Sequence, residues 1–135
     1  MTDHWKPSGS TQVVAEVSEI PVGTHKVVRV GSLDVGIFNV HGEFYALHNV
    51  CPHQFGPVCS GTIGCLAIAN RETDWQMELV KEGEILTCPW HGMEFDLKSG
   101  QSTSQKQLRL RMFPVQIIDN KVCIDVHSRR SAAIP

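Results

Sequence analysis

Short apolar segments separated by turn residues run through the middle of the chain. Residues 108–112 alternate strictly as Leu-Arg-Leu-Arg-Met, which is typical of a strand with one buried face. Pairs of apolar segments flank His41-Gly42 and Asp119-Asn120-Lys121, and both patterns predict β-hairpins. No segment keeps a helical period over three turns. We therefore predict strands at 13–17, 26–30, 35–40, 44–50, 63–69, 77–80, 84–87, 108–112, 115–118 and 122–126.

This succession of short strands predicts an all-β fold, with sheets packed as a sandwich or a partial barrel. A chain of 135 residues is expected to form one domain, because each of two separate cores would be close to the lower size limit for folding. We expect that domain at residues 11–127. Residues 1–10 and 128–135 are expected to form a flexible lead-in and a flexible tail.

Composition and charge exclude several classes of protein. The chain is 41% apolar and 19% charged, which is typical of a globular domain and not of a disordered one. Its formal net charge of -2 provides no basic excess for binding nucleic acid. The longest apolar run, residues 65–69, is far shorter than the roughly 18 residues that a membrane span needs. The first ten residues lack the apolar core of a secretory signal. We expect a cytoplasmic protein that binds neither nucleic acid nor a membrane.

Cysteine and histidine residues occur together in two loops. The segments Cys51-Pro52-His53 and Cys88-Pro89-Trp90-His91 each follow a predicted strand. In a reducing compartment, clustered cysteines more often bind metal or react than form cross-links. Two adjacent loops of this kind offer two thiolates and two imidazoles to one metal site. Zinc is an alternative, because two Cys and two His residues can also bind Zn²⁺. Zinc fingers, however, usually pair Cys with Cys and His with His.

At these residues the sequence resembles the Rieske iron–sulfur family, whose pattern is Cys-x-His, a spacer, and Cys-x-x-His. The flanking residues 49–57 and 87–100 are similar to those of soluble Rieske ferredoxins and of oxygenase Rieske domains. The resemblance extends over about residues 12–126. It implies a Rieske-type [2Fe-2S] cluster, with Cys51 and Cys88 on one iron and His53 and His91 on the other. It also implies an antiparallel β-sandwich with a small cluster-binding subdomain made of two loops, at about residues 48–100.

The ligand set and two neighbouring residues bear on the reduction potential. Two neutral imidazoles in place of two thiolates remove negative charge, so reduction is easier than in an all-Cys plant-type ferredoxin. In the high-potential respiratory members of the family, a Ser and a Tyr after the second His donate hydrogen bonds to cluster sulfurs. Those positions are Met93 and Phe95 here, and neither can donate. The resemblance therefore implies a potential near the lower end of the Rieske range.

The spacer between the two motifs departs from the family pattern. Positions 54–87 place 34 residues between the motifs, about twice the number usual in soluble members. The excess falls at about residues 65–84. Two interpretations stay open: a longer hairpin, or a partner-docking element anchored by Trp75.

The remaining cysteines also differ from the respiratory pattern. Respiratory members join their loops by a disulfide that uses the residue before the second His, and this position is Trp90 here. That disulfide is therefore excluded. Cys59 and Cys65 could pair with each other, but we expect unpaired buried thiols.

The chain contains the elements of an electron carrier. It has no nucleotide-binding fingerprint, and we expect no additional domain for a mononuclear iron. We therefore expect a one-electron carrier without substrate turnover of its own. The preferred function is the ferredoxin component that passes electrons from a reductase to a terminal oxygenase or other redox enzyme. The alternative is the small subunit of a larger oxidoreductase such as nitrite reductase.

Overall fold

The computed structural model describes residues 11–52, 56–89 and 92–127, so the predicted lead-in and tail lie outside the described residues. The described residues form antiparallel strands and three short 3₁₀ turns, without an α-helix. Among them, no helix is long and apolar enough to cross a membrane. The chain divides into two compact units: unit 1 is residues 1–48 with 111–135, and unit 2 is residues 49–110.

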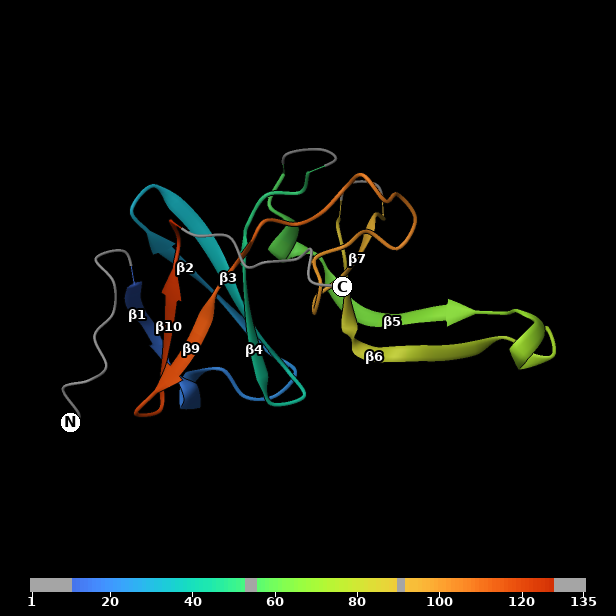
Figure 1. Ribbon diagram of the computed structural model, residues 1–135, viewed down its shortest axis with the longest axis horizontal. Helices are drawn as coiled ribbons and strands as arrows, with labels where there is room; N and C mark the ends of the chain where they lie inside the picture. Colours follow the sequence, from blue (N-terminus) through green and yellow to red (C-terminus); the bar gives the residue numbers. More distant parts are fainter. Residues whose placement is uncertain (1–10, 53–55, 90–91, 128–135) are drawn as a thin grey trace. The chain divides into compact units, whose positions relative to one another are not determined.

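Unit 1 contains two antiparallel sheets (Figure 1). One sheet has the order β1-β10-β9 and the other the order β2-β3-β4-β8. A 3₁₀ turn, η1 (Val17–Glu19), follows β1. The strands are β1 (Thr11–Glu16), β2 (His25–Val30), β3 (Leu33–Val40), β4 (Glu43–His48), β8 (Met112–Phe113), β9 (Val115–Ile118) and β10 (Lys121–Asp125).

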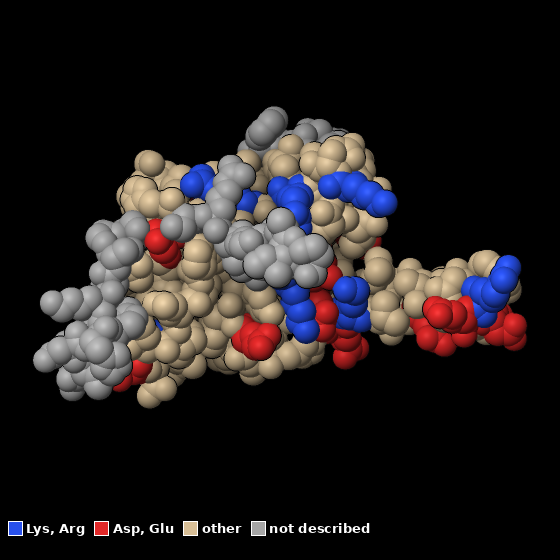
Figure 2. Space-filling model, in the orientation of Figure 1, with Lys and Arg blue, Asp and Glu red and all other residues tan. Residues whose placement is uncertain are grey.

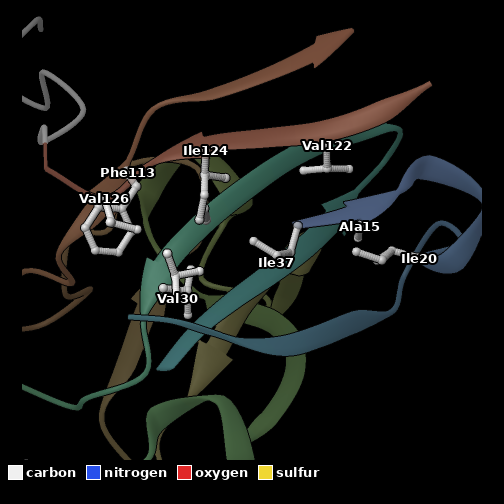
Figure 3. Packing of buried hydrophobic residues seen from close by; sticks show 10 residues of the cluster. Ala15, Ile20, Val30, Ile37, Phe113, Val122, Ile124 and Val126 are labelled. Carbon is white, nitrogen blue, oxygen red and sulfur yellow. The ribbon is translucent and has the colours of Figure 1, made fainter. Parts of the chain in front are cut away.

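The core of unit 1 is formed by apolar side chains from both sheets. Ile37 of β3 and Ile124 of β10, for example, belong to the same buried cluster (Figure 3). Alternate residues of β3 and of β10 contribute to this core, as is typical of two sheets packed in a β-sandwich. The other members labelled in Figure 3 are Ala15, Ile20, Val30, Phe113, Val122 and Val126, and the cluster also contains Val35 and Ala46. The predicted all-β antiparallel fold is confirmed.

Two tight turns set the register of unit 1. His41 and Gly42 have φ values of 54° and 95°, and Asp119 and Asn120 have φ values of 53° and 63°. Two successive left-handed residues match the twist of the flanking strands, and they are the reason why two-residue hairpin loops form here. Both predicted hairpins are present, as β3–β4 and β9–β10.

Unit 2 contains one three-stranded antiparallel sheet, with the order β5-β6-β7. Its elements are η2 (Val58–Ser60), β5 (Thr62–Ile68), η3 (Arg71–Thr73), β6 (Glu78–Thr87) and β7 (Glu94–Asp96). β7 pairs only with residues 85–87 of β6, so the far ends of β5 and β6 run beyond it as a two-stranded ribbon (Figure 1). We call residues 66–80 of this ribbon the arm.

The predicted break between strands 77–80 and 84–87 is wrong, because β6 runs through both segments. The pairing of β6 with β5 shifts register between Leu66↔Val80 and Gly64↔Ile85. The extra residues on β6 form a bulge, in which Lys81 and Gly83 have φ values of 56° and 78°. A glycine with positive φ fits a bulge as well as a turn, so Gly83 alone does not distinguish a break between two strands from a bulge in one strand.

The predicted strand at 108–112 is also largely wrong, since only Met112 belongs to a strand. Arg109 makes one isolated bridge to Gln101, and the Leu110 N–H donates to the carbonyl oxygen of Gly100. Residues 108–110 lie against loop residues, which provide no continuous ladder, whereas Arg111 and Met112 lie against the end of β4. Its alternation still describes burial, because Leu110 and Met112 are buried and Arg109 is exposed.

Candidate metal centre

The first predicted loop starts directly after β4 and is closed by short hydrogen bonds. The Cys51 N–H donates to the carbonyl oxygen of Gly56 at 2.7 Å. The side-chain oxygen of Asn49 accepts the Cys59 N–H, also at 2.7 Å. Cys51 is completely buried. These bonds fix both ends of the segment that carries Cys51, whereas His53 lies outside the described residues.

The second predicted loop connects β6 to β7. The Cys88 N–H donates to the Met93 carbonyl oxygen at 2.8 Å, and the Gly92 N–H donates to the Cys88 carbonyl oxygen at 3.1 Å. Gly92 has a φ of 68°, which favours glycine at this turn. Cys88 is buried, with 1% of its surface exposed. His91 and Trp90 lie outside the described residues.

A close approach of two backbones joins the loops within unit 2. Thr62, at the start of β5, pairs with Thr87, the residue before Cys88. A Cβ atom on Gly61 would overlap the Thr87 carbonyl oxygen. Glycine is therefore required where the chain leaves the first loop and passes the start of the second.

The five cysteine thiols lie in different environments. All five cysteines lie within the described residues, and none forms a disulfide. Burial raises the pKa of Cys59 to about 12, so this thiol stays protonated at neutral pH. Cys65 is only half-buried. The expected unpaired thiols are therefore present, although Cys65 is less buried than predicted. Cys123 is buried in β10, and burial raises the pKa of its thiol as well.

The structure brings two members of the predicted ligand set into unit 2, and the other two are histidines outside the described residues. The described residues alone contain no group of three or more metal-binding side chains. The two buried thiols nevertheless fit an iron–sulfur cluster, because thiolates are its usual ligands and burial shields it from water. Met93 and Phe95, directly after the second loop, are buried as well.

Sequence reasoning missed two residues that shape the loops. Asn49 ties the ends of the first loop together, and its position next to Val50-Cys51 was the available signal. Ser102 lies nine residues beyond Met93, and its hydroxyl donates to the Met93 sulfur at 3.5 Å. No motif marks Ser102, because its role depends on how the chain returns after β7.

The sequence comparison identifies the family. Residues 10–114 match the Rieske [2Fe-2S] domain, and the chain belongs to this family. It is 25% identical over 113 residues to ferredoxin CarAc of Metapseudomonas resinovorans, covering 82% of this chain and 89% of the relative. It is 27% identical over 109 residues to the ferredoxin component of the naphthalene 1,2-dioxygenase system of Pseudomonas aeruginosa, covering 80% of this chain and 88% of the relative.

Solved structures share the fold. A chain from the complex of reduced oxygenase and oxidized ferredoxin in carbazole 1,9a-dioxygenase superposes with a TM-score of 0.66 at 23% identity, covering 87% of this chain and 94% of that one. A putative small subunit of an NADPH nitrite reductase gives a TM-score of 0.64 at 21% identity, covering 84% and 96%. The family and the ferredoxin relatives make this chain an electron carrier with a Rieske-type [2Fe-2S] cluster, and they favour the cluster over zinc.

Proposed function

We propose that the chain is the ferredoxin component of an oxygenase system, and that it works in the cytoplasm. It takes one electron from a reductase and passes it to a terminal oxygenase. The observation that carries this proposal is its match to ferredoxin components of dioxygenase systems over most of their length. The likeness to a nitrite reductase subunit is one of fold, and it adds no support for the alternative.

Within this proposal, Cys51 and Cys88 bind one iron, and His53 and His91 bind the other. The bound cluster supplies a site that gains and loses a single electron. The chain holds the two sulfur ligands in place through the Cys51 and Cys88 N–H groups, which donate within their own loops. Residues 11–127 form one functional domain, in which about residues 48–100 bind the cluster.

The visible spectrum and an iron and sulfide assay of purified protein test the ligand assignment. We expect a red-brown protein with about two iron and two sulfide per chain. Cys88→Ser should lose the cluster, because a hydroxyl is a poor ligand for this site. Cys123→Ser is the matched control: it changes a cysteine that is equally buried but lies in β10 of unit 1. A colourless wild-type protein containing zinc would contradict the proposal.

Two further measurements test the ligands and the partner. His53→Ala and His91→Ala should also lose the Rieske spectrum, and an intact spectrum would remove that residue from the ligand set. Gel filtration of a lysate separates the two functions. A ferredoxin component elutes by itself, whereas a subunit elutes with its large partner.

A further inference from the structure

A polar loop, residues 101–108, follows β7 and is held together by one side chain. The side-chain amide of Gln101 donates to the carbonyl oxygens of Gln105, Lys106 and Leu108, at 3.3, 2.9 and 3.1 Å. The Thr103 N–H donates to the carbonyl oxygen of Glu94 in β7 at 2.9 Å. We call this segment the brace loop, because it is fastened both internally and to the strand that follows the second predicted loop.

Ser102 is the buried polar residue of the brace loop, with 5% of its surface exposed. Its hydroxyl oxygen accepts the N–H groups of Ser104 at 3.2 Å and Gln105 at 3.0 Å. The same hydroxyl donates to the Met93 sulfur at 3.5 Å. A hydroxyl has one donor and two acceptor positions, so the hydrogen-bonding capacity of Ser102 is completely used.

Met93 connects this hydroxyl to a cluster ligand. Its sulfur accepts from Ser102, and at 3.8 Å from the exposed Ser104 hydroxyl. Its carbonyl oxygen accepts the Cys88 N–H at 2.8 Å and closes the second loop. The Met93 side chain is flexible by itself, but here it is buried in a close-packed interior, so a shift of its sulfur also disturbs its backbone.

We infer that Ser102 is a positioning residue for the cluster, because it holds Met93 in the place where the Met93 carbonyl fixes Cys88. The inference rests on the proposed ligand role of Cys88 and not on the identity of the redox partner. Ser102 lies fourteen positions beyond Cys88, outside both ligand motifs.

A double-mutant cycle on the loaded protein tests this inference. The rate of cluster release is measured as loss of visible absorbance with an iron chelator in excess. Ser102→Ala removes the acceptor of two part-buried N–H groups and the donor to the Met93 sulfur, and should accelerate release roughly 5- to 30-fold. Met93→Leu keeps the size of the side chain and removes the sulfur acceptor, so it should also accelerate release. Both changes remove the contact between Ser102 and Met93, so their effects should not multiply: the double variant should release its cluster at close to the rate of Ser102→Ala, apart from the small effect of the exposed, 3.8 Å contact from Ser104.

Ser99→Ala is the matched control. The Ser99 hydroxyl accepts the Gln101 N–H at 3.1 Å, so this variant loses a similar bond beside the same loop without touching the bond to Met93. Its release rate should stay within about twofold of wild type. The paramagnetic resonance spectrum of the reduced cluster is the second measurement. Ser102→Ala and Met93→Leu should shift its g-values in the same direction, and Ser99→Ala should leave them unchanged.

Three outcomes would overturn the inference. The first is release rates for Ser102→Ala and Met93→Leu that multiply in the double variant. The second is a Ser102→Ala protein whose release rate and g-values match those of Ser99→Ala. The third applies if Ser102→Ala does not fold: Met93→Leu, which keeps the serine's other bonds, is then indistinguishable from wild type. The iron and sulfide content of the wild-type protein is measured first, so failure of the ligand assignment is recognised separately.

Discussion

The backbone at Gly61 lies so close to β6 that the residue has no room for a side chain. Its obstacle is the carbonyl oxygen of Thr87, a backbone atom that cannot rotate away as the tip of a side chain can. The same contact brings the end of the first loop to the start of the second. Close backbone contacts around the two loops therefore restrict which residues fit at these positions.

Gly61→Ala should destabilise the protein by about 1–3 kcal/mol, because the strand or the loop must shift. Thermal unfolding and cluster content measure the effect, and both should fall. Gly64→Ala is the control, since a Cβ at Gly64 meets nothing within 4 Å. It should change stability by no more than about 0.5 kcal/mol. Equal effects of the two substitutions would contradict the contact.

The buried thiol of Cys59 should make stability fall at alkaline pH. Its pKa is raised by burial to about 12, above the ordinary value of 9.0. The folded state therefore keeps a proton that the unfolded state releases, and stability declines as the pH rises from about 9 toward 12. Urea unfolding at pH 7, 9 and 10.5 measures the decline. Cys59→Ala should flatten it, and the part that remains belongs in part to Cys123, whose pKa is also raised by burial.

Phe95→Tyr should raise the reduction potential. Phe95 is completely buried in β7, next to Leu86 in register. One hydrogen bond to a cluster sulfur stabilises the more negative reduced state by roughly 1–2 kcal/mol, or about 45–90 mV for one electron. Protein-film voltammetry gives the value. Phe113→Tyr, a buried phenylalanine of unit 1, should leave the potential unchanged. An unchanged potential in Phe95→Tyr would show that the new hydroxyl does not reach a sulfur.

At the scale of elements, the arm is the feature that sets unit 2 apart. Its base is fastened at the bulge of β6, where Lys81 pairs with Asp96 at 2.7 Å and Glu84 pairs with Lys98 at 3.5 Å. Its distal apolar side chains, Trp75, Met77 and Leu79, are 68%, 75% and 65% exposed. Acidic and basic groups lie beside each other at the distal end of the arm (Figure 2). The hypothesis that the arm docks a partner stays a prediction, and these exposed side chains suit it.

Removal of the arm should leave the cluster intact. Replacing residues 66–80 by Asn-Gly joins β5 to the bulge through a two-residue turn. The pairs 62–64 with 85–87, and 85–87 with β7, stay in place. We expect an unchanged visible spectrum and iron content. Loss of the cluster would show that the distal ribbon supports the loops. If the arm docks a partner, electron transfer slows while the spectrum stays constant.

Elements whose shape is decided locally were predictable from the sequence. The turns at His41-Gly42 and Asp119-Asn120 depend on their own residues, and Cys51 and Cys88 stand in recognisable motifs. The course of β6 through Gly83 depends on pairing with β5, which no local pattern contains. The role of Ser102 depends on how the chain folds back after β7, so its distance from the ligands along the sequence gives no signal for that role.

At the scale of the whole molecule, unit 2 is inserted between two neighbouring strands of unit 1. β4 pairs with β8 through Ala46↔Phe113 and Leu47↔Met112. The His48 N–H donates to the carbonyl oxygen of Arg111 at 2.9 Å. The chain therefore leaves unit 1 and returns to it at adjacent positions, and these closing residues influence the stability of the sandwich.

His48 should make the protein less stable in mild acid. Burial, followed by the positive charge of Arg111, lowers the pKa of His48 below its ordinary value of 6.5. The unfolded state then binds a proton that the folded state does not, so stability falls as the pH drops below about 6.5. Chemical unfolding at pH 7.5, 6.0 and 5.0 measures the slope. His48→Gln should have a shallower slope, and an identical slope would contradict the assignment.

The chain leaves unit 1 at His48 and returns to it at the neighbouring Arg111. Unit 2 is therefore one continuous segment that can be exchanged as a whole. Neighbouring strands lie about 4.8 Å apart, so the two ends of any unit joined to this sandwich at His48 and Arg111 must match that short gap. A chimaera could carry the arm and loops of this protein on the sheets of a relative, or the reverse. Recombination within this family could thus exchange the surroundings of the cofactor and the sheets of unit 1 separately. Only the two short junctions, at His48 and Arg111, would have to be preserved.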